Sequence, residues 1–250
     1  MIVRISIILI LCFSSAFLRA QVINIESKRF LNDTNGWVGV TDFSFNILQN
    51  TQQVLSFSNN FRIQYQKNKS RIIFLNDINF IKAGKTNFVD SGYQQIRYNF
   101  EINKHFTIEA FTQTQYNPVL RLNFRFLNGI GPRVKVLKTE KAKIYAAALY
   151  MYEYDDITNE SQKIYEQRLS SYITFTFHFF KSIDISSTTF YQPNLGYIND
   201  YRIANDTGLE IFINKHLNYK TSFNLLYDTK QPIGVPELVY VLKNGLTLKF

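Results

Sequence analysis

The sequence predicts an all-β protein, a single transmembrane antiparallel up-and-down β-barrel of about twelve strands. Two observations predict it: apolar and polar side chains alternate with period two over most of the chain, and the alternating segments are long. Within residues 164–179, one parity carries Leu169 and Ile173 while the other carries Glu166 and Arg168. Helical spacing of apolar residues is not convincing anywhere after residue 35.

Twelve segments of this kind follow one another, and each is long enough to cross a bilayer, which takes about 9–11 residues of a tilted strand. Their approximate spans are 35–48, 52–66, 69–82, 88–102, 106–117, 120–137, 141–155, 164–179, 182–193, 200–213, 217–229 and 238–250. An even number of strands, with an apolar and a polar face, indicates a closed membrane barrel, the only sheet that pairs all its backbone groups in lipid.

The connections alternate in length, as they do in outer-membrane barrels. Those at one end are tight and contain lysine, whereas those at the other end include the longer stretches 155–163, 193–200 and 229–237. Two tight turns are near copies, Ile102–Phe106 and Ile213–Leu217. The hairpin register that the second copy implies places Glu210 opposite Lys220, a favourable cross-strand pair.

The first residues are predicted to lie outside the barrel. Residues 1–20 combine a basic start at Arg4, an apolar run over residues 5–13 and a small residue at Ala20, which indicates a secretory signal peptide. The predicted division is a signal peptide over 1–20, a short periplasmic lead over 21–34 and the barrel over 35–250, with both termini periplasmic and the protein in the cell outer membrane.

Composition excludes several other classes. The chain has 28 Lys and Arg against 19 Asp and Glu, but these charges follow strand periodicity and are interleaved, which argues against a nucleic-acid patch. Cys12 is the single cysteine and falls in the signal peptide, so we expect neither disulfides nor cysteine-based metal sites. No apolar run after residue 20 approaches the 18 residues of a transmembrane helix.

The polar parity is predicted to line the lumen. Its arginines and carboxylates are nearly balanced, so two interpretations remain open: a lattice of internal salt bridges, or a narrow passive pore for small polar or anionic solutes. The sharpest local feature is a stripe of Arg121, Arg125 and Arg133 on one wall, with a bulge expected at Pro132. The candidate lumen-lining residues are Arg97, Arg121, Arg125, Arg133, Arg168, Arg202, Asp77, Glu101, Glu109, Glu166, Asp206 and Glu210.

Other functions find less support. A binding module would use the loops 193–200 and 229–237. An outer-membrane lipid hydrolase would need a histidine, a serine and an orienting group. His178 ends a strand on the polar parity, with Ser170 and Ser171 too far along it. We therefore expect no catalytic residue, no metal and no cofactor, and we expect the acidic pair at Asp155 to lie in a solvated loop.

Short motifs spread over the chain resemble an uncharacterised family of outer-membrane barrels, a domain of unknown function named for salt-induced outer membrane proteins, in its Bacteroidetes-type form. The matching stretches are Ser58–Asn60, Asn76–Phe80, Gln115–Asn117, Gly129–Arg133, Met151–Glu153, Tyr191–Pro193, Asp200–Ile203 and Asn244–Leu246. The resemblance implies an outer-membrane barrel and carries no substrate or catalytic residues. The C-terminal Phe250 resembles the assembly signal of bacterial outer-membrane proteins, which implies outer-membrane lipids and the assembly machinery as partners. The oligomeric state stays open.

Overall fold

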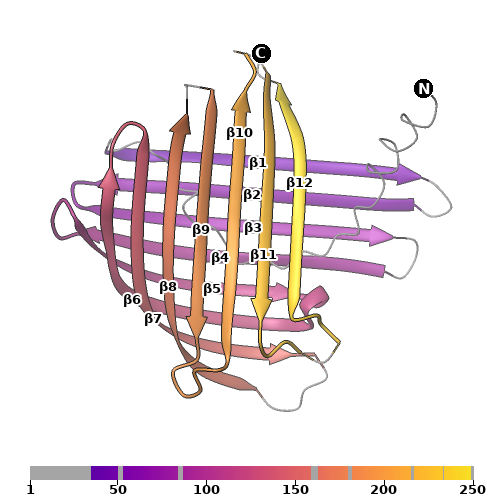
Figure 1. Ribbon diagram of the computed structural model, residues 1–250. Helices are drawn as coiled ribbons and strands as arrows, with labels where there is room; N and C mark the ends of the chain where they lie inside the picture. The colour runs from indigo at the N-terminus through magenta and orange to yellow at the C-terminus, as the bar shows by residue number, and fades with distance from the viewer. Residues whose placement is uncertain are drawn as a thin grey trace, which may run out of the picture.

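The computed structural model describes residues 35–49, 53–83, 87–158, 163–179, 182–214, 217–232 and 234–248. They form one antiparallel sheet in which every strand pairs with its neighbours in the chain, in the order β1 to β12 (Figure 1). The strands are β1 (Gly36–Gln49), β2 (Gln53–Lys67), β3 (Ser70–Ala83), β4 (Asn87–Glu101), β5 (Phe106–Asn117), β6 (Leu122–Lys138), β7 (Ala142–Ile157), β8 (Ile164–Phe179), β9 (Ile183–Pro193), β10 (Tyr201–Phe212), β11 (Leu217–Asp228) and β12 (Leu238–Leu248).

The predicted fold class and strand order are confirmed, with strand ends that differ from the expected spans by a few residues at most. Both copied hairpins close as expected: Ile102 N–H donates to the carbonyl of Phe106, and Ile213 N–H to that of Leu217. We call the end that carries these turns the tight-turn end, and the end that carries the β7–β8, β9–β10 and β11–β12 connections the loop end.

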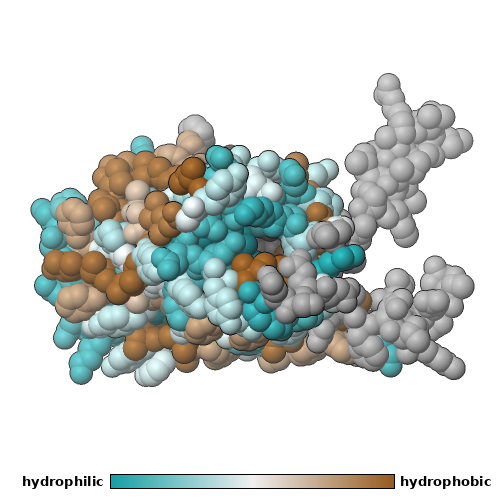
Figure 2. Space-filling model, turned by 90° about the horizontal axis from the view of Figure 1, so that it is seen from below, coloured by the Kyte–Doolittle hydropathy of each residue, from teal (hydrophilic) through white to brown (hydrophobic). Residues whose placement is uncertain are grey.

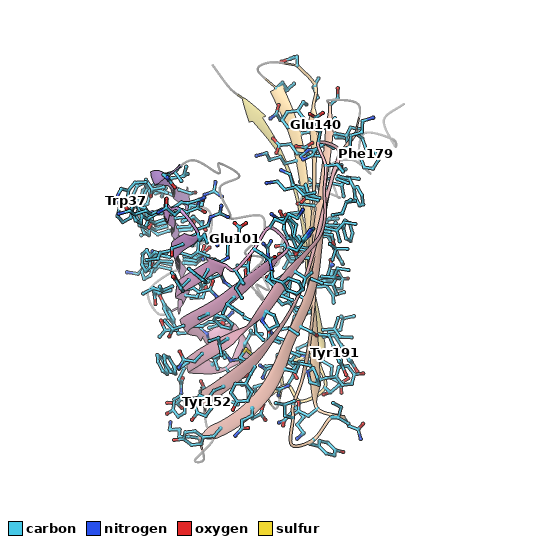
Figure 3. All side chains as sticks on the ribbon, turned by 90° about the vertical axis from the view of Figure 1, so that its left-hand side faces the viewer. Trp37, Glu101, Glu140, Tyr152, Phe179 and Tyr191 are labelled. Carbon is cyan, nitrogen blue, oxygen red and sulfur yellow. The ribbon has the colours of Figure 1, made fainter. Side chains whose placement is uncertain are left out.

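The sheet curls into an up-and-down barrel. β1 to β4 run across β8 to β12, and β5 to β7 join the two walls along a curved flank (Figures 1 and 3). Glu101 lies between the walls, whereas Trp37, Tyr152 and Tyr191 lie on the outside (Figure 3). Among the described residues, no pairing joins β12 back to β1.

A short insertion displaces one of the predicted lumen arginines. A single 3-10 turn, η2 (Pro118–Leu120), follows β5, and the register shifts between Gln115 and Asn117 and again between Leu122 and Phe124. Arg121 lies in the turn before β6 with a positive φ of 54° and an exposed side chain. The prediction that Arg121 continues the arginine stripe of β6 is therefore wrong.

The prediction of a bulge at Pro132 is also wrong. Pro132 pairs in register with Ile108 of β5. Toward β7, the register is the same before and after Pro132, although Gly131 and Pro132 themselves have no partner there. Because proline has no N–H to donate, Pro132 leaves a local gap in the hydrogen bonds between the strands, without an extra residue in β6. Its ring is exposed on the outer face. The second register shift of β6 instead lies between Lys135 and Leu137.

The outer face of the sheet is apolar. Large hydrophobic side chains are exposed on it, among them Phe43 at 71%, Leu242 at 61% and Val136 at 60%. Viewed from below the sheet in Figure 1, hydrophobic residues gather on the outer flanks and hydrophilic ones around the centre (Figure 2). Contiguous exposure of this extent is costly in water. An inside-out distribution on strands of 11–17 residues is that of a transmembrane β-barrel of the outer-membrane type.

Aromatic side chains form rows across neighbouring strands near the ends of the outer wall. Tyr154 packs 5.1 Å from Tyr165, and Tyr201 lies 5.8 Å from Tyr191 and 6.1 Å from Tyr227, measured between ring centroids. These rows lie near the loop end, where amphipathic rings suit the boundary between acyl chains and headgroups.

Close packing explains one glycine of β6. A Cβ at Gly131 would lie 2.2 Å from the carbonyl oxygen of Ala148, a backbone atom that cannot swing away. We expect Gly131→Ala to lower the free energy of unfolding in detergent by about 1–3 kcal/mol, measured by urea titration. Gly245→Ala is the matched control, because nothing lies within 4 Å of the added Cβ. Equal stability of the two variants would contradict this packing.

Several predictions concern residues outside the described ranges. These are the signal peptide 1–20, the lead 21–34 and the C-terminal Phe250. In the part of the chain that is described, no helix is long and apolar enough to span a membrane.

Candidate functional site

A buried network of ion pairs lies in the loop-end half of the barrel and is centred on Glu153 of β7. Its carboxylate is 0% exposed and contacts three arginines: Arg125 Nε at 3.1 Å, Arg168 Nε at 3.3 Å and Arg202 Nη1 at 2.5 Å. These arginines come from β6, β8 and β10, so Arg202 reaches Glu153 from three strands away. The curl of the sheet is what brings them together.

Further carboxylates surround the same arginines. Arg125 forms two parallel hydrogen bonds with Asp155, at 2.7 and 2.6 Å, and Arg202 Nε donates to Asp228 at 2.6 Å. Arg168 donates to Glu166 and to Asp200, at 2.5 and 2.9 Å. Paired in this way, each buried charge gains the partners that offset its desolvation.

Asp200 and Lys230 connect this network to the loops. Asp200 precedes β10, and its carboxylate lies 3.4 Å from Lys230 Nζ in the β11–β12 connection. Burial acts to raise the pKa of Asp200, but the hydrogen bond and charge of Arg168, together with Lys230, hold that pKa below its ordinary value. Asp200 is therefore charged at neutral pH and fixes the loops to the barrel wall.

A cavity of about 130 Å³ opens at the loop end, beside the network. Arg125, Arg168 and Arg202 line it together with the carboxylates of Asp155, Glu166 and Asp228. Lys230 and Pro232 of the β11–β12 connection also border it. Basic and acidic groups are nearly balanced in this half of the lumen.

An apolar layer crosses the interior next to the network. It is formed by inward-facing side chains, Leu149, Tyr172, Phe190 and Leu226 among them, each 7% exposed or less. A cavity of about 60 Å³ lies among them. The expectation that apolar side chains face lipid is thus wrong for part of β7, where Leu149 is buried and Tyr150 is 46% exposed.

Glu109 of β5 holds a second buried network, nearer the tight-turn end. Its carboxylate is 0% exposed and accepts hydrogen bonds from Arg97 Nη1 at 2.7 Å, Asn99 Nδ2 at 3.0 Å and the hydroxyl of Tyr172 at 2.7 Å. Arg133 Nε lies 3.5 Å away, and its guanidinium stacks over a tyrosine ring of β7. The Tyr172 contact ties β5 to β8 across two intervening strands.

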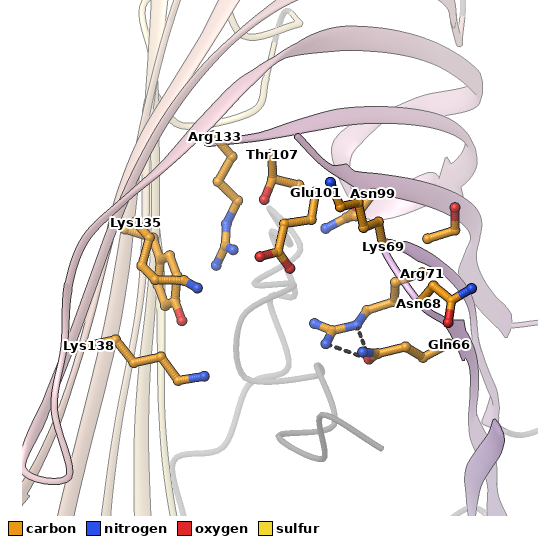
Figure 4. Close-up of a pocket in the computed structure, with 12 residues that line it drawn as sticks. Gln66, Asn68, Lys69, Arg71, Asn99, Glu101, Thr107, Arg133, Lys135 and Lys138 are labelled. Carbon is orange, nitrogen blue, oxygen red and sulfur yellow. Dashed lines mark hydrogen bonds between the residues drawn. The ribbon is translucent and has the colours of Figure 1, made fainter. Parts of the chain in front are cut away.

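The tight-turn end holds a third cavity, of about 80 Å³ and of different character. In the described part of the chain, five basic side chains and one carboxylate line it, and in Figure 4 those of β6 point toward those of β3 and β4 across the space. The charged residues are Lys69, Arg71, Arg133, Lys135, Lys138 and Glu101. Positive charge is therefore concentrated at one end of the lumen.

The structure brings most predicted lumen residues inside. Arg97, Arg125, Arg133, Arg168 and Arg202 belong to the two buried networks, together with Glu109 and Glu166, and Glu101 borders the basic cavity. Asp77 is buried on β3 beside Asn79, and Asp206 is half-buried on β10. Glu210 pairs with Lys220 at 3.5 Å in the predicted register, which is confirmed.

Sequence reasoning missed several members. Asp155 is not in a solvated loop, because it is 2% exposed at the end of β7 and bound to Arg125. Asp155 is two residues from Glu153 and so lies on the same face of the strand, and this spacing could have placed it in the lumen. Asp200 and Lys230 lie outside the strands, where the alternation carries no information, and nothing in the sequence distinguishes Tyr172 from the other aromatic residues of the strands.

The histidine and serines considered for a lipid hydrolase are not brought together in the described part of the chain. His178 Nδ1 lies 2.7 Å from Asp184 Oδ1, at the tight-turn end. Ser170 accepts a hydrogen bond from Gln192, and Ser171 donates to the carbonyl of Tyr191. Among the described residues, no group of three or more His, Asp or Glu side chains is arranged to hold a metal ion.

The family described as "Protein of unknown function, DUF481" matches residues 41–250. The chain belongs to this family. The resemblance inferred from the short motifs is thereby confirmed. A comparison with curated proteins found no match.

Two solved structures similar to this member of the family are described as porins. The NanC porin, in a rhombohedral crystal form, has 8% identity and a TM-score of 0.49, covering 86% of this chain and 98% of its own. The KdgM porin, in complex with disordered oligogalacturonate, has 12% identity and a TM-score of 0.45, covering 85% and 99%.

Proposed function

We propose that this protein is a narrow passive pore of the outer membrane for small anionic solutes, with outer-membrane lipids covering its apolar wall. The observation that carries the proposal is the distribution of charge along the interior. Among the described residues, five basic side chains and one carboxylate line the tight-turn cavity, whereas basic side chains and carboxylates are nearly balanced at the loop end. A pore with a cationic mouth concentrates anions at its entrance and excludes cations.

The interior is narrow. The cavities at the two ends are about 80 and 130 Å³, and a cavity of about 60 Å³ lies between them. The ion pairs centred on Glu153 and Glu109 separate them, so a solute has to pass beside charged groups rather than through bulk water. This supports a small conductance and a selection of solutes by their charge.

The test is a single-channel recording of the refolded mature chain in a planar bilayer under a salt gradient. We expect discrete small conductance steps and a reversal potential on the anion-selective side. Lys138→Glu, which reverses one charge of the basic mouth, is expected to move the reversal potential toward zero. The matched control is Lys163→Glu, which reverses a lysine paired with Asp156 at the loop end. Cation selectivity of the parent protein would contradict the proposal.

A second candidate is a structural barrel whose lumen is closed by its own ion pairs. The complete burial of Glu109 and Glu153 favours it. The same recording distinguishes the two, because a folded, heat-modifiable barrel without conductance would establish the closed lumen. Binding through the loops 193–200 and 229–237 stays a prediction, tested by deleting either loop and measuring whether conductance survives.

A further inference from the structure

A row of polar side chains crosses the outer wall of β1 to β5, where the surrounding side chains are largely apolar. Asn76 lies on the same face of β3 as the exposed Ile72, and Gln94 on the same face of β4 as the exposed Ile96. Register places the other members of the row on this face as well. We call the row the outer ladder, and its members are Thr41, Asn59, Asn76, Gln94 and Thr114.

Hydrogen bonds connect the outer ladder from β1 to β5. Asn59 Nδ2 donates to Thr41 Oγ1 at 3.1 Å, and Asn76 Nδ2 donates to Asn59 Oδ1 at 3.5 Å. Gln94 Nε2 donates to Asn76 Oδ1 at 3.2 Å, and Gln94 Oε1 accepts from Thr114 Oγ1 at 3.0 Å. Asn59, Asn76 and Gln94 lie at the middle of their strands, so the ladder crosses the wall near the centre of the bilayer. Polar groups at this depth are costly to expose to acyl chains.

We infer that the outer ladder is the contact between two copies of this chain in the membrane. Amide and hydroxyl groups both donate and accept hydrogen bonds, so the ladder of one copy is complementary to the same ladder of a second copy across a two-fold axis. All five side chains are uncharged, so the contact brings no like charges together. The inference goes beyond the proposed pore and does not depend on it, because the ladder lies outside the lumen.

The ladder also retains donors for such a contact. An amide nitrogen carries two hydrogens. Among the described residues, Asn76 and Gln94 each donate one hydrogen bond. On the opposite wall, by contrast, Asn205 donates to the hydroxyls of Ser187 and Thr189 at 3.1 and 2.9 Å, and its oxygen accepts from a threonine of its own strand at 2.8 Å. The amide of Asn205 is thus satisfied within its own wall, whereas the ladder has hydrogen bonds left to make.

The wall is large enough for a specific contact. The four spacings from β1 to β5 make it about 19 Å wide, and the apolar band of a membrane barrel is about 25 Å tall. Two such walls face to face cover about 1,000 Å² in total, the size at which specific interfaces begin. Side-chain hydrogen bonds add to packing in holding proteins together within a membrane, where apolar contact alone gains little over lipid.

The experiment is sedimentation of the folded mature chain in density-matched neutral detergent, over a range of protein-to-detergent ratios. We expect a reversible dimer. The double variant Asn76→Leu/Gln94→Leu is expected to raise its dissociation constant at least about tenfold, because leucine suits acyl chains and makes no hydrogen bond. Asn205→Leu is the matched control, since it removes the same group from the opposite wall, and it is expected to change the constant less than about twofold.

Cross-linking keeps the test decisive if the double variant does not fold. Cys12 is the single cysteine of the chain, so the part that follows residue 20 has none. Ile78→Cys places a thiol opposite Asn59 on the outer wall, and Ile203→Cys places one on the opposite wall, opposite Tyr191. In lipid vesicles, a short thiol cross-linker is expected to join Ile78→Cys chains in pairs much faster than Ile203→Cys chains.

A monomeric parent chain, a dimer that the ladder substitutions leave intact, or equal cross-linking from both walls would overturn the inference. A trimer would overturn it as well, because two-fold pairing of identical ladders cannot build one. Conductance is measured separately. A dimer without conductance would retain the contact and end the pore, and a conducting monomer would do the reverse.

Discussion

Glu153→Gln is expected to lower the free energy of unfolding by about 3–5 kcal/mol, because it removes a carboxylate that contacts Arg125, Arg168 and Arg202 together. Glutamine preserves the shape of the side chain but not its charge, so three guanidinium groups would lie around a neutral amide in the interior. The measurement is the urea midpoint of the refolded protein in detergent, followed by loss of heat-modifiable mobility.

Glu210→Gln is the matched control for this substitution. Glu210 and Lys220 are partly exposed and 3.5 Å apart, and pairs of this kind contribute about 1 kcal/mol or less. A double-mutant cycle with Arg202→Met is expected to give a coupling energy well above the error of about 0.5 kcal/mol that independent sites show. A midpoint for Glu153→Gln equal to that of Glu210→Gln would show that the network is not a source of stability.

Glu109→Gln is the second large effect, with an expected loss of about 3 kcal/mol or more, because Arg97 at 2.7 Å would lose the carboxylate that compensates its burial. Tyr172→Phe, which removes only the hydroxyl donated to Glu109, is expected to cost about 1.5–3 kcal/mol, the range for a hydrogen bond to a charged group. Both are measured by the same urea titration.

Tyr150→Phe is the control for the hydroxyl deletion, since Tyr150 faces outward from β7 and is 46% exposed. We expect its midpoint to match that of the parent protein. If Tyr172→Phe were equally silent, the contact between β5 and β8 would not contribute to the stability of the curled sheet.

The strand pattern could be predicted from the sequence because it is local. Alternation with period two marks each strand, and the Ile102–Phe106 turn closes through contacts a few residues apart. The same alternation placed Glu109 and Arg168 in the lumen, where both side chains are buried. These features depend on neighbours along the chain or on the adjacent strand.

The partners inside the lumen could not be predicted in the same way. Arg202 meets Glu153 from three strands away, which depends on how tightly the sheet curls. Arg121 lies outside β6 because η2 (Pro118–Leu120) shifts the register before that strand. In β7, Leu149 and Tyr150 are both apolar neighbours, so parity alone could not decide which of them faces inward.

The order of the sheet also has a kinetic meaning. Because each strand pairs only with its neighbours in the chain, hairpins can form one after another with little loop-closure entropy. The contacts from Glu109 to Tyr172 and from Glu153 to Arg202 join residues 63 and 49 positions apart, and both need the curl to exist first. They therefore belong to the late steps of assembly, and they act mainly by slowing the opening of the finished barrel rather than by speeding its formation.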